Sequence, residues 1–321
     1  MRLRIGQISS AGAWNREPSR DCDRQKLESA RAQFLTCRLG SMIHIATVHF
    51  KSNHWIAIQR DYFRKHVPKP FRVYGWLNEV PEYPADAFDY VCTEPVMDHS
   101  IKLNLLGDMM CFAATSEKDV LIFIDGDAFP INDLGPLIGK LEKHRLIAVQ
   151  RLENNGDCQP HPCFCMTTVG DWRAWKGDWK MGYEWINPQG TTMTDVGGNL
   201  LKIMQDQKVP WLPLHRSGGA GAHPVLFTIY EGLVYHHGAA FRHAVTRHDV
   251  SVEKTTLADQ LAGVFPWRRK RVILRRMRER IGKRNGELSR KLYQQIRDDA
   301  EFFQKTPHSG LRRNQMPRAA V

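Results

Sequence analysis

Apolar residues in this chain alternate between short continuous runs and longer stretches of helical periodicity. The short runs are rich in β-branched and aromatic residues, which favour strands; they are residues 43–50, 71–77, 90–93, 120–124 and 146–149. Helical spacing separates them at residues 55–65, 98–115 and 134–143, and a further helix is expected at residues 194–207. Strands that alternate with helices in this way predict an α/β fold with a mostly parallel sheet flanked by helices.

Two segments carry expectations about buried side chains. In the helix at 98–115, the spacing places Ile101, Leu105, Met109 and Phe112 on one apolar face, with Asp98 or Ser100 as its cap. The segment from 170 to 188 contains four tryptophans. Aromatic faces pack well against sugar rings, so this segment is expected either to bind an acceptor or to form ordinary core.

The run Val120–Ile124 leads directly into Asp125, Gly126 and Asp127. An uninterrupted apolar run predicts a strand buried on both faces, and open α/β sheets bind ligands at the carboxyl ends of such strands. Two carboxylates at i and i+2 point the same way on an extended chain, and Gly126 leaves room for a ligand to approach. Because like charges repel, the pair predicts a divalent cation shared with a phosphate-bearing substrate.

A third metal ligand is expected from His236 and His237, which end another short apolar run. Mg²⁺ prefers oxygen ligands, whereas Mn²⁺ also accepts imidazole. Neighbouring residues of a strand face opposite sides, so one of the two histidines is expected to face the carboxylates. The sequence leaves open which one, and a structural hydrogen-bonding role is the alternative for each.

In this order, these residues resemble the Asp-x-Asp motif and the late histidine of nucleotide-sugar-dependent glycosyltransferases with the Rossmann-like GT-A fold. The resemblance covers roughly residues 42–245 and implies Mn²⁺ (or Mg²⁺) held by Asp125, Asp127 and one of His236 and His237. It implies transfer of a sugar from a nucleotide diphosphate donor to a glycan or lipid-linked acceptor, as in surface polysaccharide synthesis. The block at 194–200 occupies the place of the acidic segment that contacts donor sugar or acceptor there.

Further residues are expected around the donor. Asp195 is the candidate catalytic residue, as general base or as sugar ligand, with a helix-capping role as the alternative. Thr47 and Asn78, near the ends of the first two strands, are expected to cradle the nucleotide. Asp125 is expected to touch the ribose or a metal-bound water. Lys102 is expected near the phosphates, or else to be a solvated surface lysine.

The net charge of +12 is concentrated at one end of the chain. Residues 266–321 hold 17 Lys and Arg against 5 Asp and Glu, whereas residues 1–265 hold 29 of each. The basic residues from Arg268 to Arg284 are mixed with apolar ones, which predicts a basic amphipathic helical tail. Such a helix is expected to rest on an anionic membrane surface, or else to be merely solvated; nucleic acid binding is the less favoured alternative.

Domain boundaries and location follow from composition. Residues 1–41 are polar and Arg-rich, so they are expected to be a disordered or non-native extension, with Met42 as the natural start. The glycosyltransferase domain is expected at 42–265 and the basic tail at 266–321. Seven scattered cysteines indicate reduced thiols, and no signal core or membrane span is found. The expected location is cytoplasmic, with peripheral contact to the inner membrane face.

Two other functional classes account for part of the sequence. A sugar nucleotidylyltransferase has a related fold and metal, but it needs a Gly-rich, basic loop after the first strand, where this chain has Ala46 to Lys51 without glycine. A non-catalytic nucleic-acid-binding protein would use the basic tail but would leave Asp125 and Asp127 unexplained.

Overall fold

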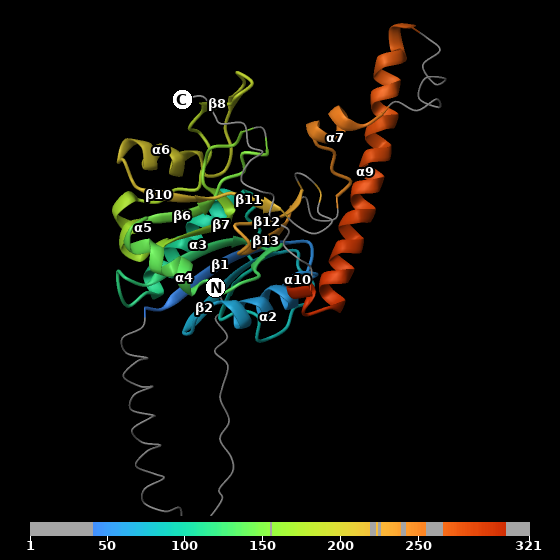
Figure 1. The fold of residues 1–321 in the computed structure, drawn as a ribbon. Coiled ribbons are helices and arrows are strands. Elements are labelled where there is room, and N and C mark those ends of the chain that lie inside the picture. Colours follow the sequence, from blue (N-terminus) through green and yellow to red (C-terminus); the bar gives the residue numbers. More distant parts are fainter. Residues whose placement is uncertain are drawn as a thin grey trace, which may run out of the picture. The chain divides into compact units, whose positions relative to one another are not determined.

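A seven-stranded sheet forms the centre of the protein (Figure 1), with the strand order β10-β6-β7-β4-β1-β2-β3. The computed structural model describes residues 41–154, 156–218, 223, 226–238, 242–254 and 266–305, with side chains from residue 271 in the last range. The expectations for residues 1–40 and 306–321 therefore lie outside the described residues.

Every neighbouring pair of strands in the central sheet is parallel except the two pairs that involve β7, which runs antiparallel to β4 and β6. The strands are β1 (Ile43–Phe50), β2 (Phe71–Asn78), β3 (Tyr90–Cys92), β4 (Val120–Asp125), β6 (Leu146–Val149), β7 (His161–Thr168) and β10 (Trp211–Leu214). The predicted α/β class and mostly parallel sheet are confirmed.

The strand order changes direction between β1 and β4. From β1 the chain builds outward through β2 and β3 on one side, whereas β4 pairs with the other side of β1. In this register Val48 lies opposite Asp125, so the carboxyl ends of β1 and β4 meet at the same edge. A crevice at such a reversal is where open α/β sheets bind ligands.

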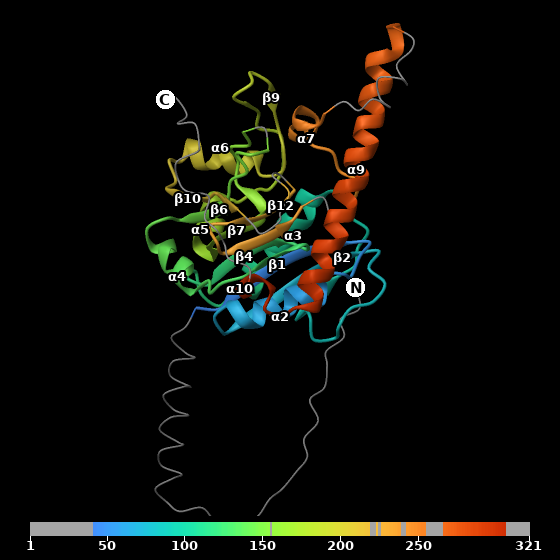
Figure 2. The same ribbon diagram turned by 45° about the vertical axis from the view of Figure 1, so that its right-hand side comes forward.

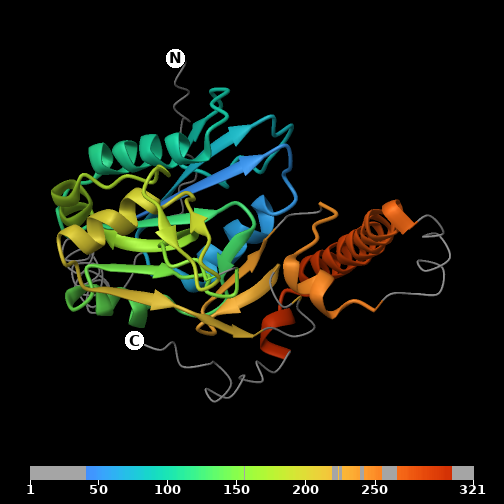
Figure 3. The ribbon, with the colours of Figure 1, turned by 90° about the horizontal axis from the view of Figure 1, so that it is seen from above.

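Helices cover both faces of the central sheet. One face packs against α2 (Ile56–His66), α4 (Gly135–Ile138) and the short 3₁₀ helix η1 (Gly139–Glu142). The other face packs against α3 (His99–Ala113), α5 (Val169–Trp175) and α6 (Gly198–Asp206). Figure 3 shows α3 on one side of the sheet and the later strands β12 and β13 on the other. The sheet is thus buried on both sides, as the apolar run at β4 predicts.

The buried face of α3 differs from the predicted one. Leu103, Leu106 and Met110 are fully buried, whereas Ile101 and Phe112 are exposed, Phe112 by 93%. The sequence does not select between these faces, because apolar residues occupy both sides of this helix. The helix start was predicted correctly, since Asp98 accepts hydrogen bonds from the backbone N–H groups of Ser100 and Ile101.

The tryptophan-rich segment is core rather than a sugar-stacking loop. Trp172, Trp175, Trp179 and Trp185 are all at least 92% buried, and the first three pack in the layer beneath α3. Trp185 lies in β8 (Trp185–Ile186), which forms a small two-stranded sheet with β9 (Thr192–Met193). Their rings are therefore not open to an acceptor.

A second, four-stranded sheet has the order β11-β12-β13-β5. Its strands are β11 (Arg216–Gly218), β12 (Phe227–Tyr230), β13 (Val234–His237) and β5 (Ala128–Pro130). β5 follows the Asp-Gly-Asp turn directly, and β13 pairs with it antiparallel, with His236 opposite Ala128. This pairing carries the late histidines to the end of β4.

The C-terminal helix α9 (Pro266–Asp298) is packed against the protein over part of its length. Leu292 and Ile296 are buried in a cluster with Trp55 and Tyr235, and the Asn285 amide donates to Ala244 O and Asp249 Oδ2 at 3.0 and 3.1 Å. Figure 2 shows its C-terminal end beside α2 and α10 (Phe302–Lys305). The preceding short helix is α7 (Arg247–Val252).

At Leu292 and Ile296, the apolar side of α9 therefore packs against the rest of the protein. Met277 and Ile281 are two of the apolar residues mixed with the basic ones in this helix, and they are 5% and 0% exposed. Among the described residues, no helix is both long enough and apolar enough to cross a membrane.

Candidate metal centre

Asp125, Asp127 and His236 meet at the carboxyl end of β4. Each offers one ligand atom, and the three atoms lie within 4.8 Å of one another. His236 Nε2 is 3.5 Å from Asp127 Oδ1 and 3.7 Å from Asp125 Oδ2. Two carboxylates and a neutral imidazole form a donor set that suits Mn²⁺, and Mg²⁺ less well.

The turn that carries both carboxylates is held by the neighbouring strand and by a buried glutamine. A Cβ on Gly126 would lie 2.4 Å from Val48 O and 2.7 Å from His49 Nδ1, so close approach of β1 requires glycine here. This corrects the expectation that Gly126 makes room for a ligand. The Gln59 side-chain amide donates to Asp125 O at 2.9 Å and to Ala128 O at 2.7 Å, which fixes both ends of the turn.

The two carboxylates cannot both be charged without cost in the metal-free protein. Burial and the nearby charge of Asp125 raise the pKa of Asp127 to about 8. Burial alone would raise the pKa of Asp125 as well, but a hydrogen bond and charge from His99, with help from His236, lower it below its usual range. We therefore expect Asp127 to hold a proton at neutral pH in the metal-free protein, and a bound cation to replace that proton.

Strand geometry separates the two late histidines. Burial lowers the pKa of His236 to about 4, so its ring is neutral and can offer a lone pair to a metal. His237 lies on the opposite face of β13, where its ring contacts Tyr235 Oη at 2.7 Å and Ser289 Oγ of α9 at 2.8 Å. Its ring also packs against Trp55 and Phe227. The structure thus brings His236 to the carboxylates and His237 to the interior.

Thr47 lies in a buried network beneath the centre rather than at its surface. It is fully buried, and its hydroxyl donates to Gln59 Oε1 at 3.2 Å. His49 Nε2 contacts the same Gln59 oxygen at 3.2 Å, and burial lowers the pKa of His49 to about 4. Thr47 therefore supports Gln59, which in turn holds the turn; it does not face a ligand.

Asn78 and Lys102 form a buried pair at the same edge of the sheet. Lys102 Nζ donates to Asn78 Oδ1 at 3.0 Å, and the Asn78 amide donates to Glu94 O at 2.7 Å. Lys102 is only 4% exposed, and burial lowers its pKa. The alternative expectation, that Lys102 is a solvated surface lysine, is therefore wrong.

Three basic side chains near the centre were not predicted. His99, the first residue of α3, has Nε2 3.3 Å from Asp125 Oδ1. His161 opens β7, and its ring lies 6.1 Å from that of His236. Arg151, just after β6, has Nη1 3.1 Å from His161 Nε2. Each of the three lies at an end of a helix or strand at the ligand-binding edge. A basic residue at such a position is the signal that could have predicted them from the sequence.

Asp195 is exposed in the loop before α6, and its Oδ1 accepts from Val196 N at 2.8 Å. The residue at the cap position of α6 is Gly197, with φ of 92°, so Asp195 does not cap this helix. Its charge also acts on Asp157, whose pKa is raised to about 6, chiefly by burial. Asp195 therefore lies close enough to Asp157, in the segment after β6, for its charge to help raise the pKa of that carboxyl.

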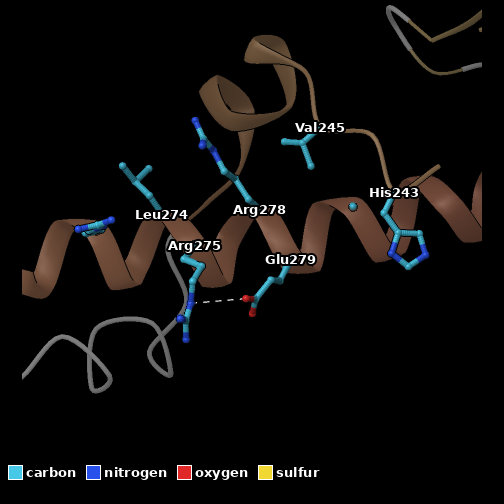
Figure 4. Close-up of a pocket in the computed structure, with 8 residues that line it drawn as sticks. His243, Val245, Leu274, Arg275, Arg278 and Glu279 are labelled. Carbon is cyan, nitrogen blue, oxygen red and sulfur yellow. Dashed lines mark ion pairs between the residues drawn. The ribbon is translucent and has the colours of Figure 1, made fainter. Parts of the chain in front are cut away.

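A separate hollow of about 660 Å³ lies along α9 (Figure 4). Its lining includes Arg271, Arg275, Arg278, Leu274 and Val245. Arg275 pairs with Glu279 at 3.5 Å, and among the described lining residues Glu279 is the only carboxylate. The described lining of this hollow holds no set of metal ligands, in contrast to the centre at the end of β4.

No family model matches the chain, and no curated protein matches it. Similar solved structures include the glycosyltransferase GlyE of Streptococcus pneumoniae TIGR4 (9% identity, 53% of this chain and 40% of that one, TM-score 0.31). Others are S. aureus TarS (10%, 43% and 30%, 0.32) and an active-site mutant of LgtC (12%, 41% and 59%, 0.30).

This chain spans less than two thirds of the length of each of these proteins. Likeness at this level leaves the function to be argued from the site itself.

Proposed function

We propose that the protein is a metal-dependent glycosyltransferase that moves a sugar from a nucleotide diphosphate donor to a glycan or lipid-linked acceptor. The observation that carries the proposal is the convergence of Asp125, Asp127 and His236 from two sheets onto the switch point between β1 and β4. A partly buried carboxylate pair with a raised pKa on one member is a poor structural element, but it is well suited to a cation.

The residues fit a divalent metal held by Asp125, Asp127 and His236. When bound there, the metal would act as a Lewis acid that stabilises the negative charge of the departing diphosphate. Asn78 and Lys102 lie at the same edge as candidates to orient the nucleotide, and Asp195 is the candidate base or sugar ligand.

The test is incubation with Mn²⁺ and a panel of sugar nucleotides, with the released nucleotide identified by chromatography. Release of a nucleoside diphosphate that EDTA abolishes and Mn²⁺ restores supports the proposal. A nucleotidylyltransferase would instead release pyrophosphate from a nucleoside triphosphate and a sugar phosphate. Equal release by the wild type and by Asp127→Ala would overturn the proposal.

We also propose that α9 brings the enzyme to an anionic membrane surface, at the inner face of a cytoplasmic membrane where lipid-linked acceptors for surface polysaccharides are built. The supporting observation is its exposed basic residues, which among the described side chains are Arg271, Arg275, Arg276, Arg278, Lys283, Arg284, Arg290, Lys291 and Arg297. Each basic residue near an anionic leaflet contributes about 1 kcal/mol of attraction. Because Met277 and Ile281 are buried in the protein, the attraction is electrostatic rather than through their insertion.

Deletion of α9 is not a clean test, because its Leu292 and Ile296 belong to the core. The better variant replaces Arg271, Arg275 and Arg278 by Gln, with Lys118, Lys140 and Lys143, which are also exposed, replaced by Gln as the charge-matched control. Cosedimentation with vesicles that contain anionic lipid should fall for the first variant, stay near wild type for the control, and weaken with salt. No wild-type binding at low salt would contradict the membrane role.

A further inference from the structure

Arg151 and His161 meet in a way that the described protein groups alone do not satisfy. Arg151 Nη1 lies 3.1 Å from His161 Nε2. The other ring nitrogen of His161, Nδ1, accepts the backbone N–H of Cys163 at 3.1 Å. Both nitrogens of one imidazole therefore face an N–H group.

A neutral imidazole cannot accept at both nitrogens, because one of them carries a proton. A guanidinium has only donors. If Nδ1 accepts from Cys163, then Nε2–H points at an Arg151 N–H; in the other tautomer, Nδ1–H points at the Cys163 N–H. The peptide N–H of Cys163 is fixed in β7, so the mismatch falls between His161 and Arg151. The Arg151 and His161 N–H groups would therefore both be satisfied by one acceptor atom placed between them.

Arg151 has a second unsatisfied donor. Its Nε is buried and has no hydrogen-bond partner among the described residues. Two nearby carboxylates accept hydrogen bonds from other donors: Glu153 Oε1 accepts from Tyr230 Oη at 3.0 Å, and Asp157 Oδ2 accepts from the Asn154 amide at 2.7 Å. Within the described ranges, no ion pair joins Arg151 to an acidic side chain.

The pair lies beside the candidate metal centre. The His161 and His236 rings are 6.1 Å apart between centroids, and His236 in turn contacts both Asp125 and Asp127. We therefore expect an anion bound at these carboxylates to lie close to Arg151 and His161. The guanidinium fork is a common partner of phosphate oxygens.

We infer that Arg151 and His161 form an anion subsite in which both donate to one phosphate oxygen of the donor's diphosphate, Arg151 through Nη1–H and His161 through Nε2–H. The inference rests on the proposed function for the identity of the anion. No bond is made or broken in this step, and no proton moves. Arg151 and His161 are thereby positioning residues that hold the diphosphate against the carboxylate–histidine centre.

The test compares Arg151→Gln with wild type by calorimetry, using Mg²⁺ with inorganic pyrophosphate and with UDP, GDP, ADP and CDP in turn. The expected loss is about 10- to 100-fold in affinity for whichever diphosphates the wild type binds, since charge-assisted hydrogen bonds are the strong ones. Arg145→Gln is the matched control, because Arg145 precedes β6 at the opposite end and pairs with Asp171. It should bind like wild type.

A second readout separates anion binding from structural damage. Mn²⁺ affinity without nucleotide should be unchanged or tighter in Arg151→Gln, because a positive charge near the centre is removed; a distorted site would bind Mn²⁺ more weakly. In the wild type, ¹⁵N chemical shifts should report the Nε2–H tautomer of His161 when pyrophosphate is bound. Weaker Mn²⁺ binding, or the other tautomer in the complex, would overturn the subsite.

The outcomes also separate this inference from the proposed function. If nucleoside diphosphates bind wild type and Arg151→Gln equally, the subsite is wrong while the proposed function survives. If pyrophosphate binds through Arg151 but no nucleotide binds, the subsite stands as an anion site and the nucleotide-sugar proposal fails. If wild type binds neither, both fail.

Discussion

His236 Nε2 and Asp127 Oδ1 lie 3.5 Å apart although they are far apart in the sequence. The cause is the pairing of β13 with β5, the strand that leaves the Asp-Gly-Asp turn, in which the His237 N–H donates to Asp127 O at 2.9 Å. The backbone of one histidine thus fixes the register, and the side chain of the other enters the centre. A one-residue slip of this pairing would exchange their roles.

Metal affinity is expected to depend on pH through Asp127. Because its pKa is raised to about 8 in the metal-free protein, a cation must displace a proton at lower pH. The apparent affinity for Mn²⁺ should therefore rise with pH, approaching about tenfold per unit below pH 8, and should level off above it. Calorimetry from pH 6 to 9 measures this, with Asp127→Asn as the variant in which the pH dependence should vanish. A flat wild-type profile would contradict the raised pKa.

His237→Ala should affect stability rather than metal binding. The change removes two hydrogen bonds and ring contacts from a fully buried position. The free energy of unfolding should fall by about 3 kcal/mol, and Mn²⁺ affinity should stay within about threefold at a temperature where the variant is folded. Thermal melts and calorimetry measure the two quantities. Loss of metal binding without loss of stability would mean that His237, not His236, serves the centre.

Gly126→Ala should distort the turn although the substitution removes no side-chain contact. The added methyl group would meet Val48 O at 2.4 Å and His49 Nδ1 at 2.7 Å. Overpacking of this kind should cost about 1–3 kcal/mol of stability and displace the carboxylates, with weaker Mn²⁺ binding as a result. Gly139→Ala is the control, because a Cβ there meets nothing within 4 Å. Equal melting temperatures for the two variants would show that β1 does not confine this turn.

Asp195→Asn tests the proposed catalytic carboxylate. As base or sugar ligand it should lower turnover by about 100-fold or more while leaving affinity for the bare nucleoside diphosphate nearly unchanged. Asp206→Asn is the control, because Asp206 is an exposed aspartate at the other end of α6, paired with Lys202. Turnover of Asp195→Asn near that of the control would remove Asp195 from the mechanism.

Local patterns predicted the parts of this structure that depend on local sequence. The apolar run 120–124 gave a strand buried on both faces, and the carboxylates at its end lie at the ligand-binding edge. The alternation of strand residues predicted that only one late histidine would face them. Choosing His236 required the β13–β5 register, which is set by contacts distant in sequence.

The features that sequence did not predict depend on packing between distant segments. Both sides of α3 are apolar, and the side that is buried is the one that packs against Phe123 and Trp172. Arg151 and His161 come together because the register of β6 and β7 shifts between Ala148 and Val149, which brings Val149 opposite His161. Such a bulge leaves no clear trace in hydrophobic periodicity.

The most direct test of the centre is electron spin echo spectroscopy of Mn²⁺ bound to the protein, which detects the magnetic nucleus of a coordinated histidine nitrogen. The account predicts one Mn²⁺ coupled to one histidine nitrogen in the wild type. The coupling should be lost in His236→Asn and retained in His237→Asn, and Asp127→Asn should bind Mn²⁺ much more weakly. A wild-type protein that binds no Mn²⁺, or a nitrogen coupling that survives in His236→Asn, would contradict the proposed metal centre.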